Sequence, residues 1–191
     1  MSKKKGILIV VSGFSGAGKG TLMKRLLEDY DDYALSVSAT TRSPRPGEED
    51  GREYFFKSVE EFEKMIDEDS FLEYASYNGC YYGTPSAPAL EAVENGKICF
   101  LIIERKGAQK IMKNYPSAVS IFLMPPDIET LEHRLKKRNT ESEDAIKNRL
   151  KIAEEEMEAS SKFTYVVVNN ELEKAVMEIN EILNSELKKR N

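Results

Sequence analysis

The feature that most constrains this chain is a glycine-rich stretch between an apolar run and a helical pattern. It reads VVSGFSGAGKGT, and its spacing G-x-x-x-x-G-K is formed by Gly13, Gly18 and Lys19. Glycines let successive backbone N–H groups point at one anion, and the N-terminus of the following helix adds partial positive charge. The stretch predicts a phosphate loop that binds a nucleoside triphosphate, with Lys19 reaching the β- and γ-phosphates. The residues expected at this ligand are Gly13, Phe14, Ser15, Gly16, Ala17, Gly18, Lys19, Gly20 and Thr21.

One position of this loop departs from the usual motif. Gly20 follows Lys19 where a Ser or Thr is usual, and the hydroxyl arrives one position later at Thr21. Because that hydroxyl is the usual side-chain ligand of Mg²⁺, the sequence leaves the protein ligands of a metal ion open. A glycine-rich turn with an exposed lysine is the alternative interpretation, and the strand and helix on either side disfavour it.

Four short apolar runs indicate the fold class. They span residues 7–11, 98–103, 118–124 and 165–168, and they are continuous, as in strands buried on both faces of a parallel sheet. Helical patterns lie between them. With 191 residues, of which 40 % are apolar, the chain can form one full hydrophobic core. We expect a three-layer α/β fold with a parallel sheet around the phosphate loop.

Two polar stretches interrupt this alternation and predict insertions at the mouth of the sheet. Residues 37–85 are rich in aromatic residues, glycine and charge, and a capping box of Ser58 and Glu61 indicates a helix. Residues 127–153 are densely charged and helical, with a second capping box at Thr140 and Glu143; a salt-bridged surface helix is the alternative interpretation. The predicted division is a core (1–36, 86–126 and 154–191), an insertion (37–85) and a helical lid (127–153).

The overall charge and the cysteines narrow the function classes. The net charge of −5 disfavours broad contact with nucleic acid or with an anionic membrane surface. No apolar segment has the length of a membrane span, and the first apolar run is too short for a secretory signal. Cys80 and Cys99 form neither a metal-like pair nor a disulfide framework. We expect a cytoplasmic protein without an obligate protein partner.

The stretch TTRSPRPGEEDGREY, which spans residues 40–54, indicates a second, anionic ligand. Arg42 and Arg45 lie three residues apart, and Pro44 and Pro46 stiffen the chain around them. Arginine presents a planar fork that binds phosphate through two hydrogen bonds. A stiff loop of this kind therefore favours recognition of a phosphorylated acceptor.

The stretch FLEYASYNGCYYGT, at residues 71–84, indicates the base of that acceptor. Glu73 lies among tyrosines, and a carboxylate can accept from the adjacent N1–H and exocyclic N2–H₂ groups of guanine. Adenine has an acceptor at N1 and would leave the carboxylate badly paired. The alternatives are a solvated surface acid at Glu73 and simple packing of Tyr74, Tyr77 and Tyr81.

Together with RLKKRNTESEDAIKNRL and YVVVNNELEKA, these stretches occur in an order and spacing that resembles the guanylate kinases, which are nucleoside monophosphate kinases of the P-loop NTPase superfamily. The resemblance runs from about residue 7 to about residue 180. It implies ATP-dependent phosphorylation of GMP to GDP (ATP + GMP = ADP + GDP) in purine nucleotide metabolism, with Mg²⁺ accompanying ATP. It also implies that residues 37–85 are a GMP-binding insertion.

The resemblance assigns roles residue by residue. The implied GMP-binding residues are Ser38, Arg42, Arg45, Glu48, Tyr54, Glu73, Tyr82, Thr84 and Glu104. The implied catalytic residues are Lys19, Arg45, Arg134 and Arg149, and ATP would also contact Arg138 and Asn169. No nucleophile constellation is visible, so catalysis would be positioning plus electrostatic stabilisation. His133, in the charged stretch, is interpreted as an exposed bystander.

The chain departs from the family pattern at several positions. Guanylate kinases usually have two acids one residue apart after the second buried strand, whereas this chain has Ile102 and Glu104. Phe14 replaces a usual proline, and Asn139 replaces a usual glycine at which Asn tolerates left-handed backbone angles. The lost carboxylate at Ile102 puts part of the family's metal or guanine network in doubt.

Two other functions stay open at this point. The ending GKGT also resembles adenylate kinase, which would change the acceptor, although Glu73 and the arginine stretch disfavour that. A binding module for phosphorylated peptides could keep the same fold. Intact Gly18, Lys19 and Thr21 disfavour the module, because their chemistry would then have no use.

Overall fold

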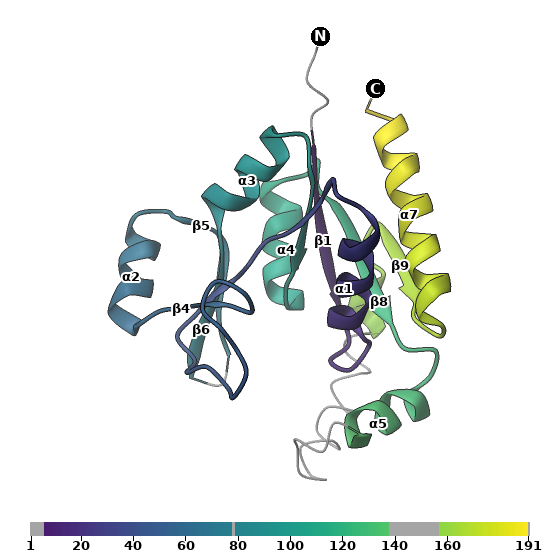
Figure 1. Cartoon of the computed structure of the whole chain (residues 1–191), viewed down its shortest axis with the longest axis horizontal. Helices are drawn as coiled ribbons and strands as arrows, with labels where there is room; N and C mark the ends of the chain where they lie inside the picture. Colours follow the sequence, from purple (N-terminus) through teal and green to yellow (C-terminus); the bar gives the residue numbers. More distant parts are fainter. Residues whose placement is uncertain (1–5, 78, 138–156, 191) are drawn as a thin grey trace. The chain divides into compact units, whose positions relative to one another are not determined.

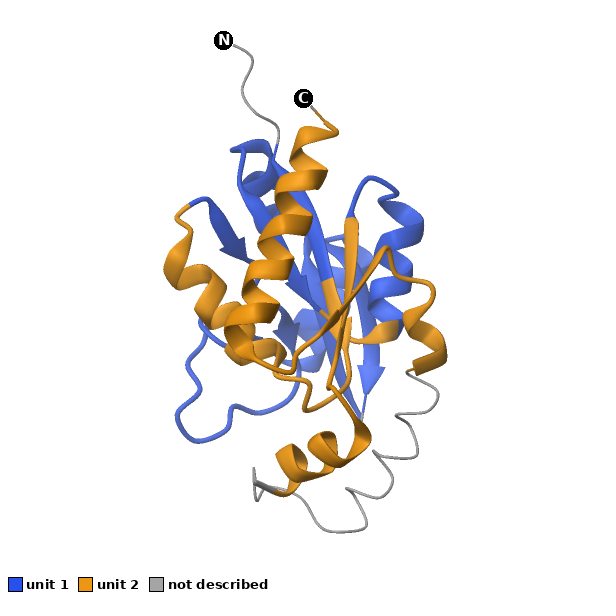
Figure 2. Ribbon diagram, turned by 90° about the vertical axis from the view of Figure 1, so that its right-hand side faces the viewer, with its two compact units in different colours: residues 1–10, 32–102, 106–118 blue, residues 11–31, 103–105, 119–191 orange. Residues whose placement is uncertain are grey.

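The computed structural model describes residues 6–77, 79–137 and 157–190. The chain divides into two compact units, coloured separately in Figure 2. The first unit comprises Met1–Val10, Asp32–Ile102 and Lys106–Ala118, and the second comprises Val11–Asp31, Ile103–Arg105 and Val119–Asn191. Each unit thus gathers segments that are far apart in the sequence.

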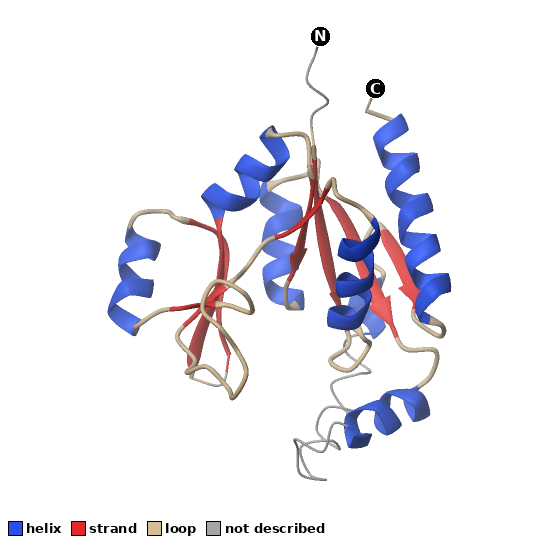
Figure 3. Ribbon diagram, viewed as in Figure 1, coloured by secondary structure: helices blue, strands red, loops and turns tan. Residues whose placement is uncertain are grey.

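A five-stranded sheet has the strand order β2-β7-β1-β8-β9 (Figures 1 and 3). Its strands are β1 (Ile7–Gly13), β2 (Tyr33–Leu35), β7 (Ile98–Ile102), β8 (Val119–Met124) and β9 (Tyr165–Val168). β2 pairs parallel with β7, and β8 pairs parallel with β9. Every residue of β1 is buried, and so are all but the last residue of β7 and of β8, as in strands covered on both faces. The predicted α/β fold with a parallel sheet is confirmed.

β2 is the strand that the sequence analysis did not predict. It has three residues, of which Leu35 is exposed and the other two are half-buried, and it lies at the edge of the sheet. A short edge strand buries too little apolar area to need a continuous hydrophobic run. The other four strands match the four predicted runs to within two residues at each end.

The helices of the second unit pack through one apolar face each. α1 buries Leu22, Met23 and Leu26, which recur at helical spacing. Outside its apolar face, α1 and the residue after it are tied to α7 by an Arg25–Glu173 ion pair and by a 2.8 Å hydrogen bond from the Asn180 amide to the Tyr30 hydroxyl. These helices span α1 (Lys19–Asp29), α5 (Ile128–Lys137) and α7 (Leu172–Lys188).

A four-stranded sheet in the first unit has the order β4-β3-β6-β5. Its strands are β3 (Ala39–Thr40), β4 (Phe55–Phe56), β5 (Phe71–Tyr77) and β6 (Cys80–Pro85). β6 pairs antiparallel with both β3 and β5, and the register sets Glu73 opposite Thr84. The first unit also contains α2 (Val59–Asp67), α3 (Ser86–Glu94) and all but the first residue of α4 (Arg105–Asn114).

The start of α2 confirms the predicted capping box. The Ser58 hydroxyl accepts from the Glu61 N–H at 3.1 Å, and the Glu61 carboxylate accepts from the Ser58 N–H at 2.8 Å. The helix then buries Phe62, whose ring stacks on Phe71 at 4.5 Å and on Tyr81 at 5.3 Å. Tyr81 therefore packs, whereas Tyr74 and Tyr77 are exposed.

Part of the predicted lid falls beyond what the structure describes. Asn139 and the capping box of Thr140 and Glu143 lie outside the described residues. Among the helices that are described, none combines the length and the apolar character needed to cross a membrane.

Candidate nucleotide-binding sites

The glycine-rich loop joins β1 to α1 within the second unit. Gly18, at the N-cap of α1, has φ +93°, a left-handed conformation that glycine adopts without strain. Gly13 has φ +137° and lies so close to the next strand that a Cβ there would overlap the Leu123 carbonyl oxygen. β1 ends at Gly13 and α1 begins at Lys19, so the predicted strand, loop and helix are confirmed.

Lys19 is folded back over this loop. Its Nζ donates to the Gly13 carbonyl at 2.6 Å and to the Phe14 carbonyl at 3.1 Å. The ammonium therefore lies beside the loop backbone and near the N-terminus of α1, which carries partial positive charge of its own. This concentration of positive potential suits a polyphosphate.

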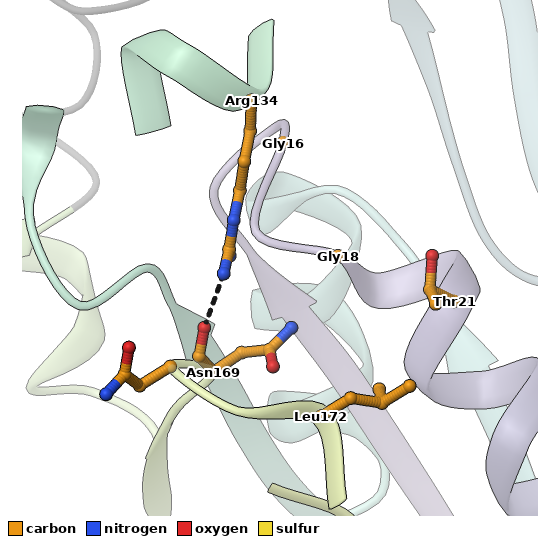
Figure 4. A pocket seen from close by; sticks show the side chains of 7 residues that line it. Gly16, Gly18, Thr21, Arg134, Asn169 and Leu172 are labelled. Atoms are coloured by element: carbon orange, nitrogen blue, oxygen red, sulfur yellow. Dashed lines mark hydrogen bonds between the residues drawn. The ribbon is translucent and has the colours of Figure 1, made fainter. Parts of the chain in front are cut away.

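A cavity of about 320 Å³ opens beside the loop in the second unit (Figure 4). Loop, helix and strand-end residues surround it: Gly16, Gly18, Thr21, Arg134, Asn169, Asn170 and Leu172. Five of these seven, all except Asn170 and Leu172, were predicted at the nucleotide. The cavity thus gathers loop residues with Arg134 and Asn169, which come from later parts of the chain.

Asn169 follows β9 and is bound to the loop. Its side-chain amide donates to the Ala17 carbonyl at 2.7 Å, and its own backbone carbonyl accepts from Arg134 Nη2 at 2.9 Å (Figure 4). A Cβ on Gly18 would come within 2.6 Å of the Asn169 amide nitrogen, so the glycine also makes room for this contact. Asn169 therefore supports the loop as well as lining the cavity.

Arg134 reaches the same cavity from α5. Figure 4 shows its side chain extending toward Asn169. One guanidinium nitrogen, Nη1, is buried and has no hydrogen-bond partner among the described residues. A buried donor of this kind costs free energy unless something accepts from it, which suits a charged oxygen in the cavity.

In the first unit, Arg42 lies in a cluster with four of the other predicted residues. Its Nη2 donates to both carboxylate oxygens of Glu48, at 3.0 Å and 2.9 Å, and its guanidinium lies 5.4 Å from the centre of the Tyr54 ring. The Tyr54 ring in turn contacts Tyr82 at 6.0 Å, edge to face. The Arg45 N–H also donates to Glu48, at 2.7 Å, while Arg45 itself is exposed.

Glu48 holds this cluster together electrostatically. Burial disfavours its charge, but hydrogen bonds from the Arg45 N–H and the Arg42 guanidinium outweigh that effect and lower the pKa of Glu48. Burial likewise opposes the charge of Arg42, whereas the hydrogen bond to Glu48 raises the pKa of its guanidinium. The two groups stay ionised and fix the direction of the Arg42 fork. Arg52, in the same stretch, forms surface ion pairs with Glu49 and Glu53.

Glu73 and Thr84 form a buried pair on neighbouring strands. Glu73 is 7 % exposed, and its Oε1 accepts from the Thr84 hydroxyl at 2.8 Å. Burial raises the pKa of Glu73, while the Thr84 hydroxyl and the charge of Lys110 act in the opposite direction. A surface acid is thereby ruled out for Glu73. Glu73 is therefore a buried carboxylate with acceptor capacity beyond the contact with Thr84.

Two residues of α4 beside this carboxylate were not predicted. A Cβ on Gly107 would overlap Glu73 Oε2, and Lys110 Nζ donates to the Tyr74 carbonyl at 2.6 Å while lying 4.9 Å from the Tyr74 ring centre. The only signal in the sequence is a glycine and a lysine three residues apart in a helical pattern. That signal does not say which strand the helix contacts.

The remaining predicted residues are placed as follows. Ser38 precedes β3 and is half-buried, and its carbonyl accepts from the Phe55 N–H at 2.9 Å. Ile102 ends β7 half-buried, and Glu104 is exposed between β7 and α4. His133 is exposed, as interpreted from the sequence. Arg138 and Arg149 lie outside the described residues.

The described residues contain no group of three or more His, Cys, Asp and Glu side chains that could hold a metal ion such as Mg²⁺ by themselves. Mg²⁺ keeps several waters and binds largely through substrate phosphates, so it needs few protein oxygens. The Thr21 hydroxyl, exposed on the first turn of α1 and lining the cavity, can supply one of them.

A parallel sheet that leads through a glycine loop into a helix, with a lysine as the first helix residue, defines a nucleotide-binding protein of the P-loop class. A family model described as "Guanylate kinase" matches residues 5–186. The chain is 54 % identical over 144 residues to a guanylate kinase of Caldanaerobacter subterraneus, covering 75 % of this chain and 70 % of the relative. It is 52 % identical over 147 residues to a guanylate kinase of Clostridioides difficile, covering 77 % of this chain and 72 % of the relative.

The crystal structure of guanylate kinase from Anaplasma phagocytophilum aligns with TM-score 0.79 and 33 % identity, over 97 % of this chain and 88 % of that one. The chain belongs to the guanylate kinase family.

Proposed function

We propose that this guanylate kinase transfers the γ-phosphoryl group of ATP to GMP, giving ADP and GDP. The observation that carries the choice of acceptor is the buried Glu73 carboxylate, which is bonded to Thr84 and keeps acceptor capacity for a ligand. Guanine offers two adjacent donors to such a carboxylate, whereas adenine offers an acceptor where one donor is needed. Glu73 and Thr84 therefore read the base, together with Ser38 and, from the end of the loop after β7, Glu104.

The GMP phosphate is held by the Arg42 cluster. The ionic contact with Glu48 and the rings of Tyr54 and Tyr82 orient Arg42, so little side-chain freedom is lost when the phosphate binds. Arg45 is exposed next to it and supplies a second fork. In this proposal Arg45 also contacts the travelling phosphoryl group.

ATP is held by the glycine loop in the second unit. In this proposal N–H groups of the loop and the Lys19 ammonium bind its phosphates. Arg134, whose Nη1 is a buried donor lacking a partner in the described part of the chain, stabilises negative charge that develops during transfer. Arg149 and Arg138 take further contacts with ATP and the transferred group in the proposal.

The chemistry is in-line transfer without a covalent protein intermediate. The residues bring two anionic substrates together, orient them and neutralise their repulsion. Mg²⁺ bound with ATP would screen the phosphate charges, and the Thr21 hydroxyl is the described group best suited to contact it or its water. The division into a core, a GMP-binding insertion (37–85) and a lid (127–153) belongs to this proposal, as does a cytoplasmic location, which two free cysteines fit.

A coupled assay tests the proposed acceptor. Purified protein, ATP and Mg²⁺ are combined in turn with GMP, AMP, CMP and UMP, and ADP formation is followed. We expect kcat/KM for GMP to exceed that for each of the other three by at least about a thousandfold. Faster turnover with any of the others would overturn the assignment, and the Lys19→Ala protein serves as the blank for contaminating kinases.

A further inference from the structure

The residue at the start of α4 that faces Glu73 is a glycine, and its backbone angles do not require one. Gly107 is buried in the helix and is not among the glycines with positive φ. Glycine has a lower helix propensity than alanine, because it loses more backbone freedom on folding. Its presence therefore needs a reason other than backbone conformation.

The reason that the structure offers is space for the Glu73 carboxylate. A Cβ on Gly107 would overlap Oε2, and it would come within 2.8 Å of Cδ and 3.4 Å of Oε1. All three contacts belong to one side chain. The helix backbone at Gly107, which carries no side chain, therefore packs directly against the Glu73 carboxylate.

Lys110, one turn further along α4, ties down the strand that carries this carboxylate. Its ammonium donates to the carbonyl of Tyr74, the residue after Glu73, and lies over the Tyr74 ring. The same charge acts favourably on ionised Glu73. Thr84 on β6 and the first half of α4 thus hold Glu73 from two sides.

We propose that Gly107 is a specificity-determining positioning residue, which sets the depth of the Glu73 carboxylate and so its reach toward the guanine edge, with Lys110 fixing the strand beside it. This inference rests on the proposed function, because it takes Glu73 to be the base-reading group. Neither residue is placed in contact with the substrate; each acts through Glu73.

The kinetic test uses Gly107→Ala. We expect KM for GMP to rise about tenfold or more, with kcat and KM for ATP within about twofold of wild type, because only the reach of the carboxylate changes. In a Glu73→Gln background, where base reading is already impaired, the same substitution should change KM for GMP by less than about threefold. Equal costs in both backgrounds would show a general effect of the helix and overturn the proposal.

A stability measurement tests the contact itself and does not depend on the activity. Gly107→Ala should lower Tm in the wild-type background, because its Cβ overlaps Glu73. In a Glu73→Ala background it should raise Tm, because the overlap is gone and alanine favours the helix. If Tm moves in the same direction in both backgrounds, Glu73 is not what requires the glycine.

Lys110→Met tests the second contact, with Lys113→Met as the matched control, since Lys113 is exposed on the same helix. We expect KM for GMP to rise about fivefold for Lys110→Met and to stay within about twofold for Lys113→Met. Equal effects would remove Lys110 from the proposal.

If wild type does not phosphorylate GMP at all, the proposed function fails. If wild type does phosphorylate GMP, and Glu73→Gln loses guanine preference while Gly107→Ala keeps it, only the positioning role of Gly107 fails.

Discussion

The phosphate loop and the Glu73 cluster (Glu73, Thr84, Gly107 and Lys110) are built in opposite ways. The loop, in the second unit, is formed by consecutive residues, and Lys19 bonds carbonyls only five and six positions away. The Glu73 cluster, in the first unit, joins residues of β5, β6 and α4, with Lys110 and its Tyr74 partner 36 positions apart. One site is local and made mainly of backbone, while the other exists only after tertiary packing.

Because of this difference, different substitutions should disrupt the two regions. The loop depends on one lysine and on its glycines. A side chain at Gly13 would overlap Leu123, and one at Gly18 would overlap Asn169. The Glu73 cluster and the Arg42 cluster depend on the identity of several ionisable side chains, and the Glu73 cluster also depends on the register of β5 and β6. Variants of the two regions should therefore separate phosphate transfer from acceptor recognition.

The largest effect is expected for Lys19→Ala in the loop. Turnover should fall by about a thousandfold or more, since the main positive charge at the transferred phosphate is lost. GMP binding, measured by calorimetric titration without ATP, should stay within about threefold of wild type, because the Arg42 cluster and the Glu73–Thr84 pair are in the first unit whereas Lys19 is in the second. Loss of GMP binding together with turnover would mean that the two regions are not separable.

Arg42→Ala should give the next largest effect. KM for GMP should rise about thirtyfold or more, because a charged hydrogen-bond donor to the phosphate is removed and Glu48 is left with an unpaired charge. Arg52→Ala is the matched control from the same stretch, and its surface ion pairs predict a change below about twofold. Initial-rate kinetics over a range of GMP concentrations measure both. A similar KM for GMP in the two variants would contradict the assignment of phosphate binding to Arg42 and not to Arg52.

Asn169→Ala should have a moderate effect on the donor side. It removes the bond to the Ala17 carbonyl and leaves a buried acceptor unpaired, at a cost of about 1–3 kcal/mol. The loop would be held less well, so we expect KM for ATP to rise about fivefold while KM for GMP stays unchanged. A shift in KM for GMP of the same size would show that Asn169 does not act through the loop.

The smallest effect concerns stability and pH at Glu73. Because burial raises the pKa of Glu73 in the folded protein, the native state binds more protons than the unfolded chain above the ordinary pKa of Glu. The contribution of Glu73 to the free energy of unfolding therefore falls as pH rises from the ordinary pKa of Glu through the raised pKa of Glu73. Glu73→Gln lacks this penalty, so its stability relative to wild type should increase from acidic to neutral pH. Urea denaturation at several pH values measures it, and a difference independent of pH would contradict the assigned cause.

The sequence predicted what local chemistry determines. Gly18 and Lys19 identified the loop and the start of α1, Ser58 and Glu61 identified the start of α2, and continuous apolar runs gave four strands of the parallel sheet. For Glu73, the sequence left a solvated surface acid open as an alternative, and its burial in the structure excludes that alternative.

What the sequence could not provide are contacts between distant segments. Nothing in it pairs Asn169 with Ala17, 152 positions away, or rests Gly107 on Glu73. β2 was missed because a three-residue edge strand leaves no hydrophobic pattern. Each of these depends on which elements pack together, and periodicity along the chain does not encode that.

The most direct test of the account is the ratio of kcat/KM for GMP to kcat/KM for AMP, measured for wild type and for Glu73→Gln under identical conditions. Gln keeps the size of the side chain but replaces one acceptor oxygen with a donor, so it disturbs base reading with little change in packing. If Glu73 reads the base, the ratio should fall by about tenfold or more in the variant, while KM for ATP is unchanged. An unchanged ratio would contradict that role, because guanine would then be read by residues other than Glu73.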